Sequence, residues 1–222
     1  MTASPPSPVL VTGAAGFIGM LVCERLLRRG DAVVGLDSFT DYYPITLKHA
    51  RLAALNRLAA ELGGRFTFVQ ADLADPEAIS ELFAHHRPRR VVHLAAQAGV
   101  RYALEHPMAY AGSNLTGTTV ILENCRRHQV EHLVMASSSS VYGGSQRVPF
   151  TESDPADHPV SFYAATKRSN EMMAHSYAHL FGLPITALRY FTVYGPWGRP
   201  DMAVWKFTDA LLQGREIEVF AG

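Results

Sequence analysis

The chain has 222 residues, 48% of them hydrophobic and 18% charged, and its 20 Lys and Arg residues are balanced by 20 Asp and Glu residues. This zero net charge lacks the electrostatic footprint of a nucleic-acid-binding protein, and the ordinary apolar content is unlike that of a disordered chain. No apolar run reaches the length of about 18 residues that a membrane span needs, and the first residues have no signal-peptide pattern. We therefore expect a globular cytoplasmic protein with neither nucleic-acid nor membrane partners.

Apolar, β-branched runs alternate with helical segments along almost the whole chain. Strands are predicted at residues 9–12, 31–37, 66–72, 91–95, 133–137 and 185–190. Helices are predicted at about 17–29, 45–62, 107–128 and 162–182, with a short helix begun by Asp75 and Pro76 and a last helix capped by Asp201, before a short strand near 218–220. Because parallel strands need helical crossovers, this alternation predicts an α/β fold: a Rossmann-type, doubly wound parallel sheet with helices on both faces.

A glycine-rich turn, GAAGFIG at 13–19, stands between the first predicted strand and the first predicted helix. Gly13 lets the turn tighten, Gly16 lets the backbone approach a pyrophosphate, and Gly19 lets helix and strand pack closely. The N–H groups at the start of the helix, near Phe17 and Ile18, would bind phosphate oxygens. The strand and helix that flank the turn favour this interpretation over a tight turn without a ligand.

Carboxylates follow the second and third predicted strands. Asp37 comes 18 residues after Gly19, where it would accept hydrogen bonds from the ribose hydroxyls of an adenosine and would repel a 2′-phosphate. NAD is therefore favoured over NADP. Asp72 and Leu73 are placed to reach the adenine edge, although a plain loop before the next helix explains them equally well.

Tyr163 and Lys167 lie four residues apart in YAATK, so they share one face of a predicted helix. A phenol has a pKa of about 10, and a neighbouring ammonium group favours the phenolate and lowers that pKa. Such a pair can accept the proton of a sugar or alcohol hydroxyl. The four serines at 137–140 follow a predicted strand at the edge where open α/β sheets bind ligands, which indicates hydrogen bonds to a substrate hydroxyl.

Five motifs together resemble the extended short-chain dehydrogenases/reductases that act on nucleotide sugars: GAAGFIG at 13–19, HLAAQAGVRYALEHP at 93–107, ASSSSVYG at 136–143, YAATK at 163–167 and LRYFTVYGPWGRPDMA at 188–203. The resemblance covers nearly the whole chain from Val9 onward. The stretches LDSFTDYYPITLKHARL and TVYGPWGRPDMA are most similar to the UDP-glucuronate 4-epimerases within that family.

The resemblance implies roles for individual residues. Tyr163 would be the base, Lys167 its electrostatic partner and a ribose ligand, and Ser138, four residues before Tyr142, the catalytic hydroxyl. Asn114 would support the strand edge. Further contacts are implied with the sugar at Ser139, Ser140 and Thr192, with the nicotinamide at Tyr190, and with the middle of the cofactor at Leu94, Ala95 and Ala96.

The implied reaction is an NAD-dependent 4-epimerisation of UDP-glucuronate to UDP-galacturonate. Tyr163 would remove the proton of the sugar 4-hydroxyl while the C4 hydride passes to bound NAD; the 4-keto sugar would turn over, and the hydride would return to the opposite face. The cofactor would stay tightly bound, since it ends as it began. Another nucleotide-sugar epimerase, dehydratase or decarboxylase of the same family is the alternative.

The neutral residues Ser139 and Ser140 favour epimerisation, because decarboxylating and dehydrating relatives carry acidic residues at these positions. Arg101 and Arg199 are candidates for binding a substrate carboxylate, with a structural salt bridge equally open for each. The remaining pair of interest, His175 and His179, lies one helical turn apart but lacks a third ligand, so we expect no metal site there.

The resemblance also implies a domain organisation. Residues 1–8 would be a flexible tail, 9–190 an NAD-binding Rossmann domain, and 191–222 the start of a substrate-binding lobe that is largely absent from this chain. A catalytically incomplete NAD-binding remnant is the alternative to an enzyme. The helices at 107–128 and 162–182 resemble the pair with which such proteins form a four-helix interface, which implies a homodimer.

Overall fold

A single parallel sheet organises the protein, for which a computed structural model describes residues 7–217. Six strands lie in the order β3-β2-β1-β4-β5-β6. Their bounds are β1 (Val9–Thr12), β2 (Val33–Asp37), β3 (Phe66–Gln70), β4 (Arg90–His93), β5 (His132–Ser138) and β6 (Ile185–Tyr190). The chain therefore runs outward from β1 to β3, crosses back to β4, and runs outward again, which confirms the predicted doubly wound Rossmann fold.

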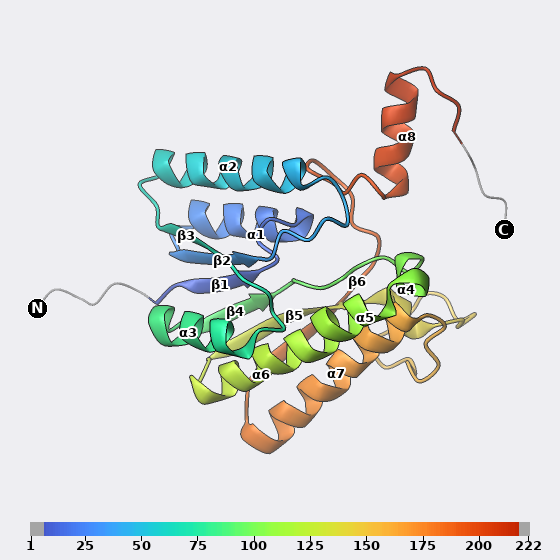
Figure 1. The fold of residues 1–222 in the computed structure, drawn as a ribbon. Coiled ribbons are helices and arrows are strands. Elements are labelled where there is room, and N and C mark those ends of the chain that lie inside the picture. Colours follow the sequence, from blue (N-terminus) through green and yellow to red (C-terminus); the bar gives the residue numbers. More distant parts are fainter. Residues whose placement is uncertain (1–6, 218–222) are drawn as a thin grey trace, which may run out of the picture.

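Helices cover both faces of the sheet (Figure 1). α1 (Phe17–Arg28) and α2 (Ile45–Glu61) lie on one face, and α3 (Pro76–His86), α6 (Gly117–Arg127) and α7 (Phe162–Phe181) lie on the other. Shorter elements are α4 (Tyr102–Glu105), α5 (Pro107–Tyr110), the π-helical segment η1 (Ala111–Thr116) and the 3-10 segment η2 (Ser139–Tyr142). α8 (Ala203–Leu212) projects away from this body.

β1 forms the centre of the core because both of its faces are buried. Leu10 packs into one cluster with Phe83 and Leu122, under α3 and α6. Val9 and Val11 pack into the other cluster, under α1 and α2. A short apolar run without alternation is what a parallel strand covered by helices on both sides requires.

Several predicted boundaries differ from the structure at the carboxyl ends of strands. β3 ends at Gln70 rather than Asp72, and β4 ends at His93 rather than at residue 95. Asp72 and the segment 94–96 therefore lie in loops beyond the sheet edge. The predicted helix at 107–128 is confirmed as α5, η1 and α6 in direct succession.

The prediction that Asp201 caps the last helix is wrong. α8 begins after Met202 and has no side-chain cap, because the Asp201 carboxylate is instead bound by the Arg199 guanidinium. The short strand predicted near 218–220 and most of the predicted tail, residues 1–6, lie outside the described residues. Within the described range, no helix combines the length and apolarity needed to span a membrane.

Candidate functional site

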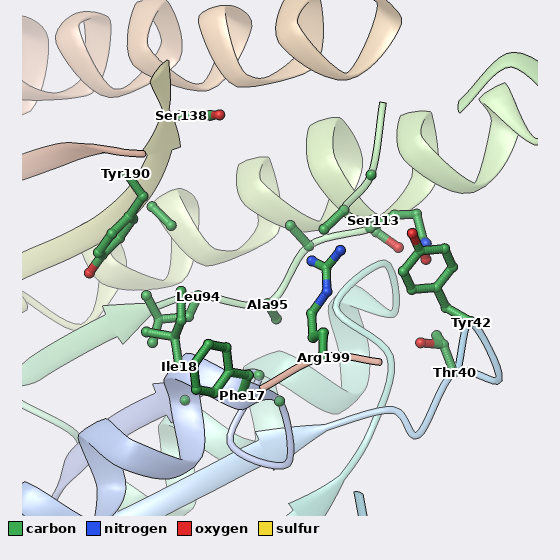
Figure 2. Close-up of a pocket in the computed structure, with 18 of the residues that line it drawn as sticks. Phe17, Ile18, Thr40, Tyr42, Leu94, Ala95, Ser113, Ser138, Tyr190 and Arg199 are labelled. Carbon is green, nitrogen blue, oxygen red and sulfur yellow. The ribbon is translucent and has the colours of Figure 1, made fainter. Parts of the chain in front are cut away.

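A cavity of about 440 Å³ opens at the carboxyl edge of the sheet, where the strand order reverses between β1 and β4. Figure 2 shows side chains from segments far apart in the sequence that meet there. The lining includes every predicted cofactor contact, namely Gly13, Gly16, Phe17, Ile18, Gly19, Asp37, Asp72, Leu73, Leu94, Ala95, Ala96, Tyr163, Lys167 and Tyr190. It also includes the predicted substrate contacts Ser138, Ser139, Ser140, Thr192 and Arg199.

The glycine turn has no room for larger side chains. Gly13 has a φ of +73°, and a Cβ atom on Gly19 would lie 1.9 Å from the Gly13 carbonyl oxygen. A Cβ atom on Gly16 would lie 3.0 Å from the same oxygen. α1 begins at this turn without a side-chain cap and without an acidic residue in its first turn. The free N–H groups and positive end of α1 therefore suit an anionic group such as a pyrophosphate.

Asp37 ends β2 as a buried carboxylate, 8% exposed. It accepts hydrogen bonds from the backbone N–H groups of Ala15, at 3.2 Å, and Phe39, at 2.9 Å. A carboxylate has about four acceptor positions, so positions remain for the two hydroxyls of a ribose. The glycine turn and Asp37 together fit a dinucleotide cofactor.

Lys48 is a lining residue that the sequence analysis missed. Its Nζ lies 3.6 Å from Asp37 Oδ1 and donates to Thr40 Oγ1 at 3.1 Å. Burial lowers the pKa of Lys48, while the Asp37 charge opposes that shift. The sequence signal was only its place on the helix that follows the second strand, eleven residues after Asp37, and tertiary folding brings the two together.

The predicted adenine contacts have a structural role as well. Asp72 Oδ1 accepts a hydrogen bond from the Ala74 N–H at 2.9 Å, which shapes the loop before α3. Leu73 packs against Gly117, where any Cβ atom would come within 2.7 Å of the leucine side chain. Both residues line the cavity, so the loop serves its own geometry and the site at once.

Tyr163 and Lys167 lie on the first turns of α7, which Ser161 caps by accepting a hydrogen bond from the Ala164 N–H at 3.1 Å. The buried Lys167 donates from Nζ to the Ala136 carbonyl at 2.9 Å, and burial lowers its pKa to about 8. This bond anchors α7 to β5 and brings the Tyr163 hydroxyl to the end of that strand.

The predicted lowering of the Tyr163 pKa by the Lys167 ammonium stays a prediction. Burial raises the pKa of the Tyr163 phenol above its ordinary value, and the opposing groups are the Ser138 hydroxyl and the Arg199 charge. The Lys167 ammonium itself donates a hydrogen bond to the Ala136 carbonyl. The Ser138 hydroxyl is close enough to the phenol to act on its pKa, as a proton-transfer site requires.

The serine cluster divides between two sides of β5. The Ser138 Oγ faces the cavity and accepts hydrogen bonds from the Ser140 N–H at 3.2 Å and the Ser140 hydroxyl at 2.8 Å. Ser137 donates to Glu171 at 2.5 Å, and Glu171 is also held by Arg189. Ser137 therefore has a structural partner, and its neighbours present the hydroxyls for a ligand.

Arg199 fits both interpretations that the sequence left open, a structural salt bridge and a cavity residue that could bind a carboxylate. Its Nε and Nη2 donate to the two oxygens of Asp201 at 3.0 and 2.6 Å, and Tyr42 donates to the same carboxylate at 3.0 Å. The side chain still reaches into the cavity, toward Ser113 (Figure 2). Arg101 is exposed at the start of α4 and is not among the residues that line the cavity.

Asn114 supports the loop after β4. Fully buried in η1, it accepts from the Gln97 N–H at 2.8 Å and donates to the Gln97 carbonyl at 3.1 Å and to Thr166 Oγ1 at 3.0 Å.

The rings of His175 and His179 stack 6.5 Å apart. Over residues 7–217, no group of three His, Cys, Asp or Glu side chains is arranged to hold a metal ion.

Comparisons with known proteins agree with this geometry. The model of the NAD dependent epimerase/dehydratase family matches residues 9–222. The probable UDP-glucuronate 4-epimerase of Rhizobium meliloti is 50% identical over 95% of this chain and 60% of its own length. UDP-glucuronate 4-epimerase 4 of Arabidopsis thaliana is 52% identical over 96% of this chain and 47% of its own length. The chain thus spans about half to three fifths of these two relatives.

Solved structures of UDP-sugar 4-epimerases share the fold of this chain. UDP-glucuronic acid 4-epimerase from Bacillus cereus, in complex with UDP-glucuronic acid and NAD, superimposes with a TM-score of 0.84 at 38% identity, over 94% of this chain and 64% of that one. UDP-glucose 4-epimerase from Thermotoga maritima, with UDP-glucose, superimposes with a TM-score of 0.85 at 33% identity, over 96% of this chain and 66% of that one.

Proposed function

Since the chain belongs to the NAD-dependent epimerase/dehydratase family, we propose that it carries the cofactor-binding and catalytic part of a UDP-glucuronate 4-epimerase, which converts UDP-glucuronate to UDP-galacturonate. The observation that carries the proposal is the meeting of Ser138, Tyr163 and Arg199 in the same cavity as the glycine turn. A hydroxyl, a phenol and a guanidinium are the groups that a sugar with a 4-hydroxyl and a carboxylate would need.

NAD would lie with its pyrophosphate at the glycine turn and its adenosine ribose at Asp37. Its role when bound is to take a hydride from the sugar C4 and return it. Lys167 would hold the nicotinamide-side ribose, and Tyr190 would flank the ring. Because the Asp37 carboxylate is buried and already faces Lys48, a ribose hydroxyl is a better partner for it than a second anion.

Tyr163 would take the proton of the 4-hydroxyl on its Oη and later return it to the same oxygen of the sugar. Ser138 would hold that hydroxyl against Tyr163, with Ser139, Ser140 and Thr192 as further sugar contacts. Ser138 and Arg199 both lower the pKa of the phenol and so favour the form that accepts a proton. The neutral side chains of the serine cluster supply no carboxylate near the sugar, which supports epimerisation over loss of carbon dioxide or water.

Arg199, rather than Arg101, is the proposed ligand of the substrate carboxylate. Arg199 donates from Nε and Nη2 to Asp201 and from Nη2 to the Met202 sulfur at 3.8 Å. Nη1 has no hydrogen-bond partner within residues 7–217, so it would be available to an acidic sugar. The Asp201 partner also fixes the plane of the guanidinium, which would orient Nη1 for a charge-assisted hydrogen bond to a carboxylate.

The proposal is tested by incubating the protein with UDP-glucuronate and NAD and following the sugar by chromatography with mass detection. A product of unchanged mass and the retention of UDP-galacturonate is expected. A product lighter by carbon dioxide would instead establish a decarboxylase. Bound NAD with no sugar product would count against turnover of UDP-glucuronate by this chain.

We also propose that the protein is a homodimer through the helices at 107–128 and 162–182. These helices carry exposed apolar side chains, including Met108 at 79% and Met172 at 56% exposure. Exposed methionines on neighbouring helices are typical of an interaction surface rather than of a solvated face.

A further inference from the structure

Arg51 is a buried cation that the proposed function does not use. It lies on α2 with no exposed surface and is not among the residues that line the cavity. Guanidinium groups stay charged in proteins, and burying a charge is costly unless hydrogen bonds compensate it. All of the hydrogen bonds that the structure shows for Arg51 go to neutral oxygens. A buried charge held in this way calls for a reason beyond core packing.

The two ends of the guanidinium join segments that are distant in sequence. Nη1 donates to the Ala15 carbonyl in the glycine turn at 3.2 Å and to the Tyr43 hydroxyl at 2.7 Å. Nη2 donates to the Trp197 carbonyl at 2.6 Å and the Gly198 carbonyl at 3.4 Å. One side chain therefore ties the glycine turn to residues 195–199, which we name the Arg199 loop.

The Arg199 loop needs this support because its backbone is strained. Trp197 has a φ of +64°, a left-handed conformation that is unfavourable for a bulky residue. A backbone bond from the Gly198 N–H to the Gly195 carbonyl, at 3.1 Å, closes the loop on itself. The carbonyl of the strained residue is the one that Arg51 holds most closely. Arg199 follows two residues later, so the conformation at Trp197 sets the direction in which its side chain leaves the backbone.

We propose that Arg51 is a positioning residue that fixes the Arg199 loop and thereby gives the site its preference for a sugar with a carboxylate. The inference rests on the proposed function only in that Arg199 is the carboxylate ligand. Arg51 itself touches neither the sugar nor the cofactor. Without its two bonds to the loop, Trp197 can relax to a negative φ, and Arg199 then no longer points into the cavity.

The test uses Arg51→Met, which keeps much of the volume but none of the donors, and Arg51→Lys, which keeps the charge and one donor group. Arg57→Met is the matched control, because Arg57 is exposed on the same helix. Dissociation constants are measured for UDP-glucuronate, UDP-glucose and UDP on the NAD-loaded protein. The wild type should prefer UDP-glucuronate over UDP-glucose by about tenfold to a hundredfold, as expected of a charge-assisted hydrogen bond.

Arg51→Met should lose most of that preference, as Arg199→Met should by removing the carboxylate ligand itself, while its affinity for UDP should stay within about twofold of the wild type. Arg51→Lys should restore part of the preference, and Arg57→Met should keep all of it. A residue that only stabilised the fold would weaken all three ligands together. Full preference in a folded Arg51→Met protein would overturn the proposal.

A second measurement reports on the loop without any sugar. The chain has two tryptophans, so Trp205→Phe leaves Trp197 as the only reporter of fluorescence. Arg51→Met in this background should shift the emission to the red, and Arg57→Met should not; an unchanged emission counts against the inference. If the wild type shows no preference for an acidic sugar, the proposed substrate fails, and this emission still decides whether Arg51 holds the loop.

A milder variant covers the case in which Arg51→Met does not fold. Tyr43→Phe removes the 2.7 Å hydrogen bond of Arg51 Nη1 and changes the volume little. It should shift the Trp197 emission in the same direction by a smaller amount and reduce the preference for UDP-glucuronate about twofold to tenfold. A Tyr43→Phe protein identical to the wild type in both respects would contradict the role of Arg51.

Discussion

The pKa of the Tyr163 phenol is set by opposing effects of its surroundings. Burial works against its ionisation, while the Ser138 hydroxyl and the Arg199 charge work for it. Both opposing groups come from other elements than α7, one from the end of β5 and one from the loop after β6. The chemistry of this residue therefore depends on the relative placement of three segments.

Replacing Tyr163 by Phe removes one oxygen and leaves the ring in place. We expect turnover of UDP-glucuronate to fall by about a hundredfold to ten-thousandfold, the usual contribution of a positioned proton acceptor. NAD affinity should change little, because the ring still fills its place. Steady-state rates and cofactor titration measure the two effects. Tyr194→Phe is the control, since Tyr194 is 72% exposed, and an equal loss in both variants would argue against Tyr163 as the base.

Residue spacing predicted that Tyr163 and Lys167 share one helix and that a glycine turn precedes the first helix, but it missed Lys48 and Arg51. Both lie on α2, and their partners Asp37, Ala15 and Trp197 are reached only once the segment between β2 and α2 has folded back over the sheet edge. A long charged side chain on a helix is normally expected to be solvent-exposed. Nothing in its immediate neighbours signals that tertiary contacts bury it.

At the level of elements, the junction of β1 and α1 depends on the missing side chain of Gly19. Gly19→Ala would bring a Cβ atom into the Gly13 carbonyl oxygen, so the turn must open. We expect NAD binding to be lost and the free energy of unfolding to fall by about 1–3 kcal/mol, as for other overpacked positions. Isothermal titration and urea unfolding measure these effects.

Gly112→Ala is the matched control for that change. Gly112 lies in a helical segment, and an added methyl group there would meet nothing within 4 Å, so the position should tolerate alanine without loss of NAD binding. Replacing a helical glycine by alanine commonly stabilises by up to about 1 kcal/mol. Normal NAD binding by Gly19→Ala would show that the turn is less tightly packed than the structure indicates.

The buried side chain of His93, on β4, bonds to β1 and α6, and its low pKa makes the stability of the protein depend on pH. Its ring nitrogens bond to Thr12 on β1 at 2.8 Å and Thr118 on α6 at 3.1 Å, and burial lowers its pKa from 6.5 to about 3. The unfolded chain therefore binds the proton first. Stability from this group is complete above pH 6.5 and is lost as the pH falls toward 3, by up to about 1.4 kcal/mol per pH unit.

His93→Asn should flatten that acid limb, although it lowers stability at neutral pH by removing two bonds. Urea unfolding at several pH values between 4 and 7.5 gives the slope of the unfolding free energy against pH. Compared with the wild type, the slope of His93→Asn should correspond to about one bound proton fewer. His175→Asn, at an exposed position, should leave the slope unchanged. Equal slopes in all three proteins would contradict a neutral buried His93.

Element order and type followed from the sequence, because apolar runs of strand length alternate with helical periods. Local boundaries followed less well. The π-helical segment η1 contains Asn114, whose buried bonds to Gln97 are tertiary contacts that local patterns do not predict. The predicted Asp201 cap is wrong because a guanidinium competes for the same carboxylate. Capping rules assume that the side chain has no stronger partner, and here it has one.

At the level of the whole molecule, the helix surface formed by α5, α6 and α7 gives a test of the proposed dimer. Met172→Glu places a charge on an exposed apolar position of α7 and should convert a dimer into a monomer at micromolar concentration. Light scattering coupled to size exclusion measures the mass. Leu62→Glu is the control, because Leu62 is 46% exposed at the end of α2 on the opposite face of the sheet. A wild-type protein that is already monomeric would exclude the dimer.

The central place of β1 has a consequence for how the protein is made. On one side of β1, Thr12 pairs with Leu36 of β2, which follows soon after it in the chain. On the other side, Thr12 pairs with His93 of β4, which follows much later. At about 5–20 residues per second, the ribosome needs roughly 4–16 seconds to travel from Thr12 to His93. The glycine turn is thus synthesised first among the functional segments, but the sheet around it is completed only when β4 pairs with β1. NAD added during translation should therefore protect the nascent chain from proteases only after β4 has emerged.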